Sequence, residues 1–528
     1  MVAALAAAIV AAGLWAYSTS FAGVFALDDV RAIVRNPTIQ TLWPLSTPLT
    51  PPSRSTVGGR PVANLSFAIN YALAPGVNAA AAGAGSGTSE PAAAAGLDPV
   101  PFHVGNLLIH LTAALLLFGV TRRTLTTPRL APRSGGAASW LAFAVAVVWV
   151  VHPLCTAAVT YIVQRVESLM GLFYLLTLYC AVRAAEGDRA RAWTVAAIAS
   201  CAAGMATKEA MVTAPVVVAI WDWCFAADSA GAPRRPRWSL LAGLAATWIV
   251  LALMLQTENR SASVDLAAAT AWSYLLTQTA VILHYVKLVF VPMPQAFMYD
   301  WPLVMSWLDV AWQALLLLAL ATVTGWAVVR RRPAGFLGAW FFLVLAPSSS
   351  VLPVVTEVAA EHRMYLPLAA IVAFLVLGAF RAWQQVLSDG ASAARGAVTA
   401  AVALAALVVA LGLMTRARND VYASAIGLWQ DTVATRPADA RPRVALGEAL
   451  AAAGRFGEAE SQLQTGVTLA PADPNARVRL GAVLAELGRY DEAIPQLERA
   501  LVLRPGDADA TRMLARLYAM RRPSPWPR

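Results

Sequence analysis

The chain has 528 residues, of which 59% are hydrophobic and only 13% are charged. Soluble globular domains carry roughly 25% charged residues, so this composition excludes that class and indicates a polytopic membrane protein. The net charge of +10 does not indicate nucleic-acid binding, because Lys and Arg occur in short clusters between apolar segments, as topology signals do. The four cysteines lie in or beside apolar segments without a CxxC motif, which favours neither a disulfide framework nor a zinc site.

Apolar runs that can form membrane-spanning helices occur along most of the chain, since a helix needs ~20 residues to cross a hydrocarbon core of ~30 Å. We predict about eleven spans, near residues 3–24, 104–121, 138–156, 166–184, 193–206, 210–226, 239–257, 308–329, 336–352, 366–383 and 397–416. The first is expected to be a retained helix, with a cleaved signal as the alternative, because it lacks a basic start. The basic clusters fall between alternate spans and mark the cytoplasmic face.

This topology places the loop 25–102 and everything after residue 417 on the outer side of the membrane. A further apolar run, 272–292, would break the alternation if it crossed completely, and it contains Gln278, His284 and Lys287. We therefore expect an interfacial or re-entrant helix there. The stretch 78–98 is low in complexity and is expected to be a flexible insertion.

The C-terminal part repeats with a period of 34 residues. Residues 437–470 and 471–504 align without a gap, and 505–520 begins a third copy. Matched small and large residues, such as Gly447 with Gly481 and Leu463 with Leu497, are typical of tetratricopeptide repeats. The predicted architecture is all-α, a membrane helix bundle followed by a short α-solenoid. Its expected domains are a membrane domain (1–417), a connecting helix (418–436), the repeats (437–520) and a disordered tail (521–528).

Two adjacent carboxylates, Asp28 and Asp29 in FALDDVRAIVRNP, follow the first span. Neighbouring like charges raise each other's pKa unless a cation compensates. We interpret the pair as a catalytic base and its neighbour, against the alternative of a solvated helix end. A divalent cation at the pair is left open, and no other metal site is expected.

Three basic residues on the predicted outer side come from separate segments: Arg165, Lys208 and Arg363. If they converge, they form a phosphate-binding pocket. The alternatives are snorkelling side chains and internal ion pairs. Supporting residues are expected to be the nearby acids Glu167, Glu209 and Glu361, the neighbouring His362 and Tyr365, and a fourth cation, Arg60.

His103, Asn106 and His110 share one face of the second predicted helix. Two histidines that are two turns apart span ~10 Å, which is too far to share a metal without help. A supporting role for His103 and Asn106 in catalysis and a purely internal hydrogen-bonding role are both compatible with this pattern.

These motifs together resemble the transmembrane and tetratricopeptide repeat-containing O-mannosyltransferase family. The likeness rests on their order and spacing: FALDDVRAIVRNP, RPVANLSFAINYAL with FHVGNLLIHL, YIVQRVESL, TKEAMVTAP and EHRMYLP, followed by the repeats. The insertion after Gly76 and the short repeat array depart from typical members. These departures bear on acceptor recognition more than on the chemistry.

The resemblance implies a fold of the GT-C type, found in lipid-sugar glycosyltransferases. It implies an inverting enzyme that moves a sugar, with mannose expected, from a polyprenyl phosphate to a hydroxyl of protein Ser or Thr on the outer face. Asp28 or Asp29 would be the base, and Arg165, Lys208 and Arg363 would hold the donor phosphate. An acceptor protein and a protein partner on the repeats are expected, in a bacterial inner membrane. The alternatives are a non-enzymatic repeat scaffold for envelope assembly and a lipid-linked sugar flippase.

Overall fold

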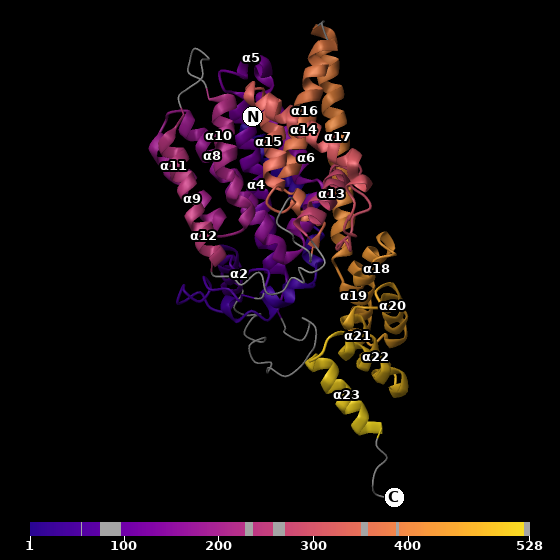
Figure 1. The fold of residues 1–528 in the computed structure, drawn as a ribbon. Helices are drawn as coiled ribbons and strands as arrows, with labels where there is room; N and C mark the ends of the chain where they lie inside the picture. Colours follow the sequence, from indigo (N-terminus) through magenta and orange to yellow (C-terminus); the bar gives the residue numbers. More distant parts are fainter. Residues whose placement is uncertain are drawn as a thin grey trace, which may run out of the picture. The chain divides into compact units, whose positions relative to one another are not determined.

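The structure, a computed structural model, describes residues 1–53, 55–73, 97–226, 236–256, 270–349, 357–386 and 390–521. All regular elements in these ranges are helical, as predicted (Figure 1). The chain forms two compact units, which are described separately below. Most of the predicted insertion 78–98 and of the predicted tail 521–528 lies outside the described residues.

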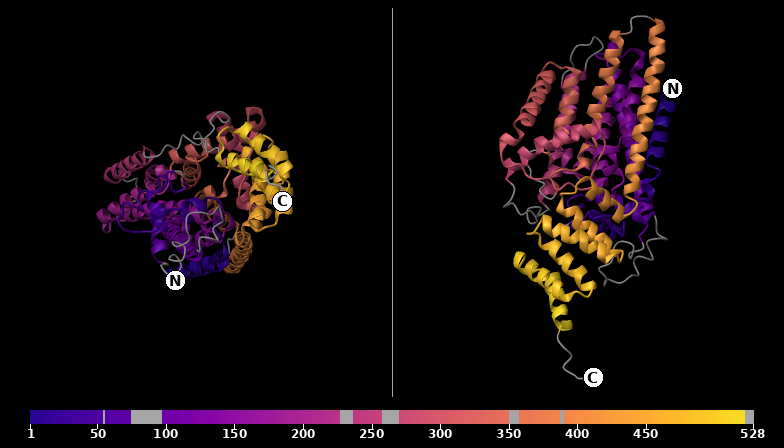
Figure 2. Two further views of the ribbon diagram at one scale, coloured as in Figure 1. Left: turned by 90° about the horizontal axis from the view of Figure 1, so that it is seen from below. Right: turned by 90° about the vertical axis from the view of Figure 1, so that its right-hand side faces the viewer.

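The first unit contains the long apolar helices, which run alongside one another in Figure 1 and in the right-hand view of Figure 2. α4 is central, because it packs against α1, α6 and α8. Proline stands in the first turn of α2, α10 and α15, where its missing N–H costs no helical hydrogen bond. The helices are α1 (Val2–Ala16), α2 (Pro61–Ala72), α4 (Val100–Leu125), α6 (Ala138–Val150), α8 (Arg165–Ala185), α9 (Ala190–Met205), α10 (Ala214–Phe225), α11 (Trp238–Ala246), α12 (Trp248–Gln256), α13 (Ala271–Phe290), α14 (Ala311–Val329), α15 (Pro333–Leu345), α16 (Pro367–Val386) and α17 (Gly390–Val421).

Seven described helical segments are long and apolar enough to cross a membrane, or eight if the bent pair Ala138–Val150 and Pro153–Val159 counts as one span. Three of the eleven predicted runs instead form the shorter helices α9, α10 and α15, of 16, 12 and 13 residues. A complete span needs about 20 residues. The 20-residue helix α13 is not among the seven segments.

One face of α4 carries polar side chains into the packed interior. His103, Asn106 and His110 are at most 1% exposed. His110 binds the Tyr365 hydroxyl through Nδ1 at 2.9 Å and the Val150 carbonyl through Nε2 at 3.0 Å. Buried polar groups require such partners. This face therefore connects α4 to α6 and to the segment that precedes α16.

The second unit contains the repeats. Its helices are α18 (Ala425–Thr435), α19 (Ala440–Ala452), α20 (Phe456–Leu469), α21 (Pro474–Glu486), α22 (Tyr490–Leu503) and α23 (Ala508–Arg521). A Cβ added at Gly447 would lie 2.5 Å from Leu463, and one at Gly481 would lie 2.8 Å from Leu497. The two helices of each repeat thus approach as closely as the matched small residues predicted.

A short segment from the middle of the chain, 294–301, also belongs to the repeat unit. Phe297 packs edge-on against Trp429 of α18, with ring centroids 5.2 Å apart. The Arg436 guanidinium lies over the rings of Tyr299 and Trp301, at 5.8 and 5.6 Å. The predicted domain boundaries did not include this contribution, because its aromatic residues resemble those of an ordinary membrane-flanking loop.

Candidate functional site

The two adjacent carboxylates occupy different environments. Asp29 is fully buried, and its two oxygens accept hydrogen bonds from the backbone N–H groups of Ala26 at 2.9 Å and Val163 at 2.7 Å. Asp28 is half-buried, and only its backbone N–H is bonded, to the Tyr161 hydroxyl at 3.0 Å. In the described part of the chain, the Asp28 carboxylate has no hydrogen-bond or ion-pair partner.

The protonation of the pair follows from this difference. Burial raises the pKa of Asp29 to about 8, with a smaller contribution from the charge of Asp28 and an opposing effect of the two backbone hydrogen bonds. Asp29 is therefore mostly neutral at pH 7. Protonation of Asp29 thus relieves the repulsion between the two carboxylates that the sequence indicates.

Two ion pairs join four of the other predicted residues. Lys208 Nζ, in the turn before α10, donates to Glu167 Oε2 of α8 at 2.6 Å, and both side chains are at most 10% exposed. Arg60 Nη2, just before α2, lies 3.2 Å from both carboxylate oxygens of Glu209. Arg60, Lys208 and Glu209 line a small hollow of about 220 Å³. Its opposite wall is apolar and includes Leu251 and Leu255 of α12.

His362 lies near three cations, two of which, Lys208 and Arg363, belong to the predicted phosphate pocket. It is buried, and burial lowers the pKa of this imidazole well below its usual value, with further lowering by the charges of Lys208, Arg363 and Arg60. These three residues come from separate segments, and the third predicted phosphate ligand, Arg165, is not among the charges that act on His362. His362 Nε2 lies 3.8 Å from the Glu357 carboxylate.

Arg165, by contrast, is held by the protein itself. It is 1% exposed and donates to Asn106 Oδ1 at 2.5 Å and to the carbonyls of Ser66 at 3.1 Å and Phe102 at 2.8 Å. Its guanidinium also lies 4.4 Å from the centre of the Phe67 ring. Direct phosphate binding by Arg165 stays a prediction, and it requires these hydrogen bonds to be exchanged.

Arg363 is similarly enclosed. Its Nη1 donates to the carbonyls of Ser348 at 3.1 Å and Val358 at 3.2 Å, and its Nη2 donates to the carbonyl of Glu357. The side chain therefore fixes the loop before α16, in which His362 and Glu357 lie. Its charge contributes to the cationic cluster, while most of its donors face protein carbonyls.

The remaining predicted residues have mainly structural contacts. His103 Nε2 lies 3.0 Å from the carbonyl of Gly23, and Asn106 Nδ2 donates to Val159 and Ile162 carbonyls. Glu361 is buried, and the Tyr365 hydroxyl binds His110. On α4 the internal hydrogen-bonding interpretation accounts for the contacts of both supporting residues.

The divalent cation considered for the aspartate pair stays untested: both oxygens of Asp29 accept backbone hydrogen bonds, and the Asp28 carboxylate has no partner among the described residues. Within the described ranges no group of three or more His, Cys, Asp or Glu side chains could hold a metal ion.

Sequence reasoning missed Tyr161 and Glu357. The Tyr161 hydroxyl binds the backbone of Asp28, and burial raises the pKa of Tyr161 well above its usual value, with contributions from Asp28, Asp29 and Glu357. These acids therefore surround one hydroxyl. Tyr161 directly precedes the IVQR segment, so an aromatic residue beside the predicted Arg165 motif was the available signal.

The fold and the repeats define a polytopic membrane protein with a C-terminal tetratricopeptide array. A family model described as tetratricopeptide repeat matches residues 417–476, 444–508 and 478–522.

Curated relatives match part of the chain. The chain is 28% identical over 306 residues to the protein O-mannosyl-transferase Tmtc2 of Drosophila melanogaster, which covers 54% of this chain and 29% of the relative. It is 31% identical over 229 residues to human TMTC4 (39% and 27% covered) and 27% identical over 224 residues to human TMTC3 (40% and 20%). Both human proteins are also named protein O-mannosyl-transferases. The matches span less than a third of these relatives. They confirm the predicted resemblance to the transmembrane and tetratricopeptide repeat-containing O-mannosyltransferases.

Proposed function

We propose that this chain is a membrane glycosyltransferase that moves a sugar, with mannose as the first candidate, from a polyprenyl phosphate to a hydroxyl of protein Ser or Thr. The observations that support the proposal are a half-buried carboxylate without a described partner, Asp28, and two cations from separate segments, Lys208 and Arg60, that line one hollow. The names of the relatives support the same class of reaction. We further propose that the site and the repeats lie on the outer face of a bacterial inner membrane.

Asp28 is the proposed general base. It is half-buried and has no competing partner in the described residues, and a carboxylate can accept a hydroxyl proton as the oxygen attacks the anomeric carbon. Attack from the face opposite the phosphate inverts the anomeric centre. Asp29, which burial keeps neutral, accepts two backbone hydrogen bonds and so positions the segment that carries Asp28.

Lys208 and Arg60 are the proposed contacts for the donor phosphate. Both line the small hollow, whose other wall is apolar, an arrangement suited to the junction of a phosphate and an isoprenoid chain. As the glycosidic bond breaks, negative charge grows on the phosphate, and preorganised cations stabilise it. Glu167 and Glu209 hold the two cations in place before the lipid binds. Arg165 and Arg363 orient the surrounding loops, and direct phosphate contact by either remains part of the proposal to be tested.

The test is a transfer assay with purified protein, radiolabelled polyprenyl-phosphate mannose and Ser/Thr-containing acceptor peptides. Donor-dependent labelling of peptide by the wild type, lost in Asp28→Asn, supports the proposal. A flippase would instead move labelled lipid between leaflets of a vesicle without labelling peptide. A scaffold would do neither, and either result would overturn the proposal.

A further inference from the structure

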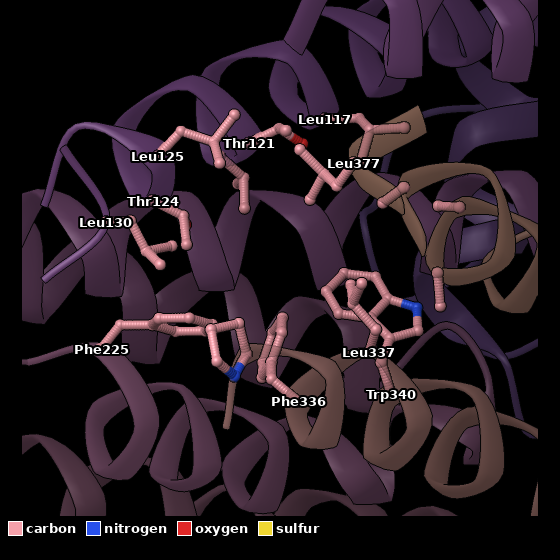
Figure 3. Close-up of a pocket in the computed structure, with 15 residues that line it drawn as sticks. Leu117, Thr121, Thr124, Leu125, Leu130, Phe225, Phe336, Leu337, Trp340 and Leu377 are labelled. Atoms are coloured by element: carbon pink, nitrogen blue, oxygen red, sulfur yellow. The ribbon is translucent and has the colours of Figure 1, made fainter. Parts of the chain in front are cut away.

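An apolar pocket lies between α4, α10, α15 and α16 (Figure 3). The space between its walls is about 580 Å³, which includes space open to the surroundings. In Figure 3 the rings of Phe225, Phe336 and Trp340 form one side, opposite Leu125 and Thr121 of α4. None of the residues that line the pocket is charged, so the lining suits a hydrocarbon chain.

The pocket is separate from the candidate site. Arg165 contacts α4 near its start, at Phe102 and Asn106, whereas the pocket begins at Leu117. Eleven residues of α-helix correspond to about 16 Å. Thr121 and Leu337 are only half-buried, so the pocket is reachable from outside the bundle, where a membrane protein meets lipid.

Two arginines stand next to the pocket in the chain. Arg129 precedes the lining residue Leu130, and Arg331 lies two residues before the lining residue Pro333. Arg129 Nη2 donates to the Arg331 carbonyl at 2.9 Å, and the Arg331 guanidinium lies 3.8 Å from the centre of the Trp223 ring.

Neither of these guanidinium groups forms an ion pair with a carboxylate in the ranges that the structure describes. Other arginines nearby do: Arg123 Nη1 lies 2.6 Å from Glu186, and Arg237 pairs with Asp222. An anion that also carries a hydrocarbon chain would match both these two cations, which have no described carboxylate partner, and the apolar pocket.

We propose that this pocket holds an acyl chain of an anionic phospholipid, with the lipid phosphate at Arg129 and Arg331. The position along α4 separates this lipid from the glycosyl donor, whose proposed phosphate contacts lie elsewhere. Each Arg near an anionic membrane surface contributes a preference of about fivefold over a zwitterionic lipid. The pocket thus binds anionic phospholipids in preference to zwitterionic ones.

Photo-crosslinking tests the proposal directly. The full chain is reconstituted with phosphatidylglycerol that carries a diazirine in one acyl chain, and in parallel with the matching phosphatidylcholine. We expect phosphatidylglycerol to label residues 117–125 and 333–340 at least fivefold more than phosphatidylcholine does. α14 is the internal reference, because its exposed Leu315, Leu318 and Val323 should be labelled equally by both lipids.

Variants separate headgroup binding from chain binding. Arg129→Gln and Arg331→Gln should each lower pocket labelling by phosphatidylglycerol about fivefold, and Ala373→Leu should lower labelling by filling the pocket. Arg191→Gln, which removes an exposed charge from α9, should leave it unchanged. Excess unlabelled phosphatidylglycerol should compete at the pocket in the wild type, which needs no variant. Equal pocket labelling by the two lipids, or an equal loss in Arg191→Gln, would overturn the proposal.

Discussion

Replacing Asp29 with Asn removes a buried carboxyl group whose pKa lies near 8 in the folded protein, compared with about 3.9 in an unfolded chain. Between these values the folded state binds one more proton than the unfolded state. The free energy of unfolding therefore falls as pH rises from about 4 through 8. Between pH 6 and pH 8 this single group should lower wild-type stability by about 2 kcal/mol.

The Asn variant should lose that pH dependence. It should also be less stable than the wild type at pH 6, by about 1–3 kcal/mol, because the amide nitrogen cannot accept one of the two backbone hydrogen bonds. Asp28→Asn is the matched control, since its half-buried carboxylate has no described partner and its stability should change by less than about 0.5 kcal/mol.

The assay is unfolding of the purified protein in detergent at pH 6, 7 and 8, compared among the wild type, Asp29→Asn and Asp28→Asn. The control should keep the wild-type pH dependence while losing transfer activity about 100-fold or more. The reasoning is refuted if the wild type and Asp29→Asn respond identically to pH, or if Asp28→Asn alone removes the response.

Lys208→Met should weaken polyprenyl-phosphate binding by about 10- to 150-fold, the value of one charge-assisted contact. Titration with the lipid checks this, and unchanged affinity contradicts the phosphate assignment. Arg165→Lys removes a planar guanidinium group that donates hydrogen bonds to three groups, and it should lower the free energy of unfolding by about 2–4 kcal/mol. A larger loss of donor affinity than in Lys208→Met would indicate that Arg165 binds the phosphate directly. Gly447→Ala should destabilise the repeats by about 1–3 kcal/mol, because the added methyl group would contact Leu463. Gly457→Ala, at an exposed position of α20, should be neutral or stabilising. Thermal unfolding compares the two variants, and equal effects would contradict the packing argument.

Much of the repeat unit was predictable, because its information is local and periodic. The 34-residue register placed α19 to α22, and the matched Gly447 and Gly481 lie at the helix contacts that the alignment indicated. The segment 294–301 was not predictable, since no repeat or motif marks a contact between residues so distant in sequence. Its aromatic side chains acquire a role only once Trp429 and Arg436 lie beside them.

The membrane unit was predictable in class but less so in detail. Hydropathy identifies apolar runs, but it does not tell a complete span from a shorter buried helix such as α10, which has 12 residues. Motif order predicts that Asp28, Lys208 and His362 share one candidate site, and this grouping stays a prediction. Motif order does not distinguish Lys208, which lines a hollow, from Arg165, whose donors are occupied by carbonyls and Asn106. That difference depends on the tertiary partners of each cation.

The most direct test of the central claim is the fate of the labelled sugar when purified protein is mixed with polyprenyl-phosphate mannose and a Ser/Thr peptide. The account predicts mannosylated peptide of inverted anomeric configuration from the wild type, with only background from Asp28→Asn. Contradiction would come from a wild-type protein that binds the lipid yet transfers nothing, or from Asp28→Asn that transfers at the wild-type rate.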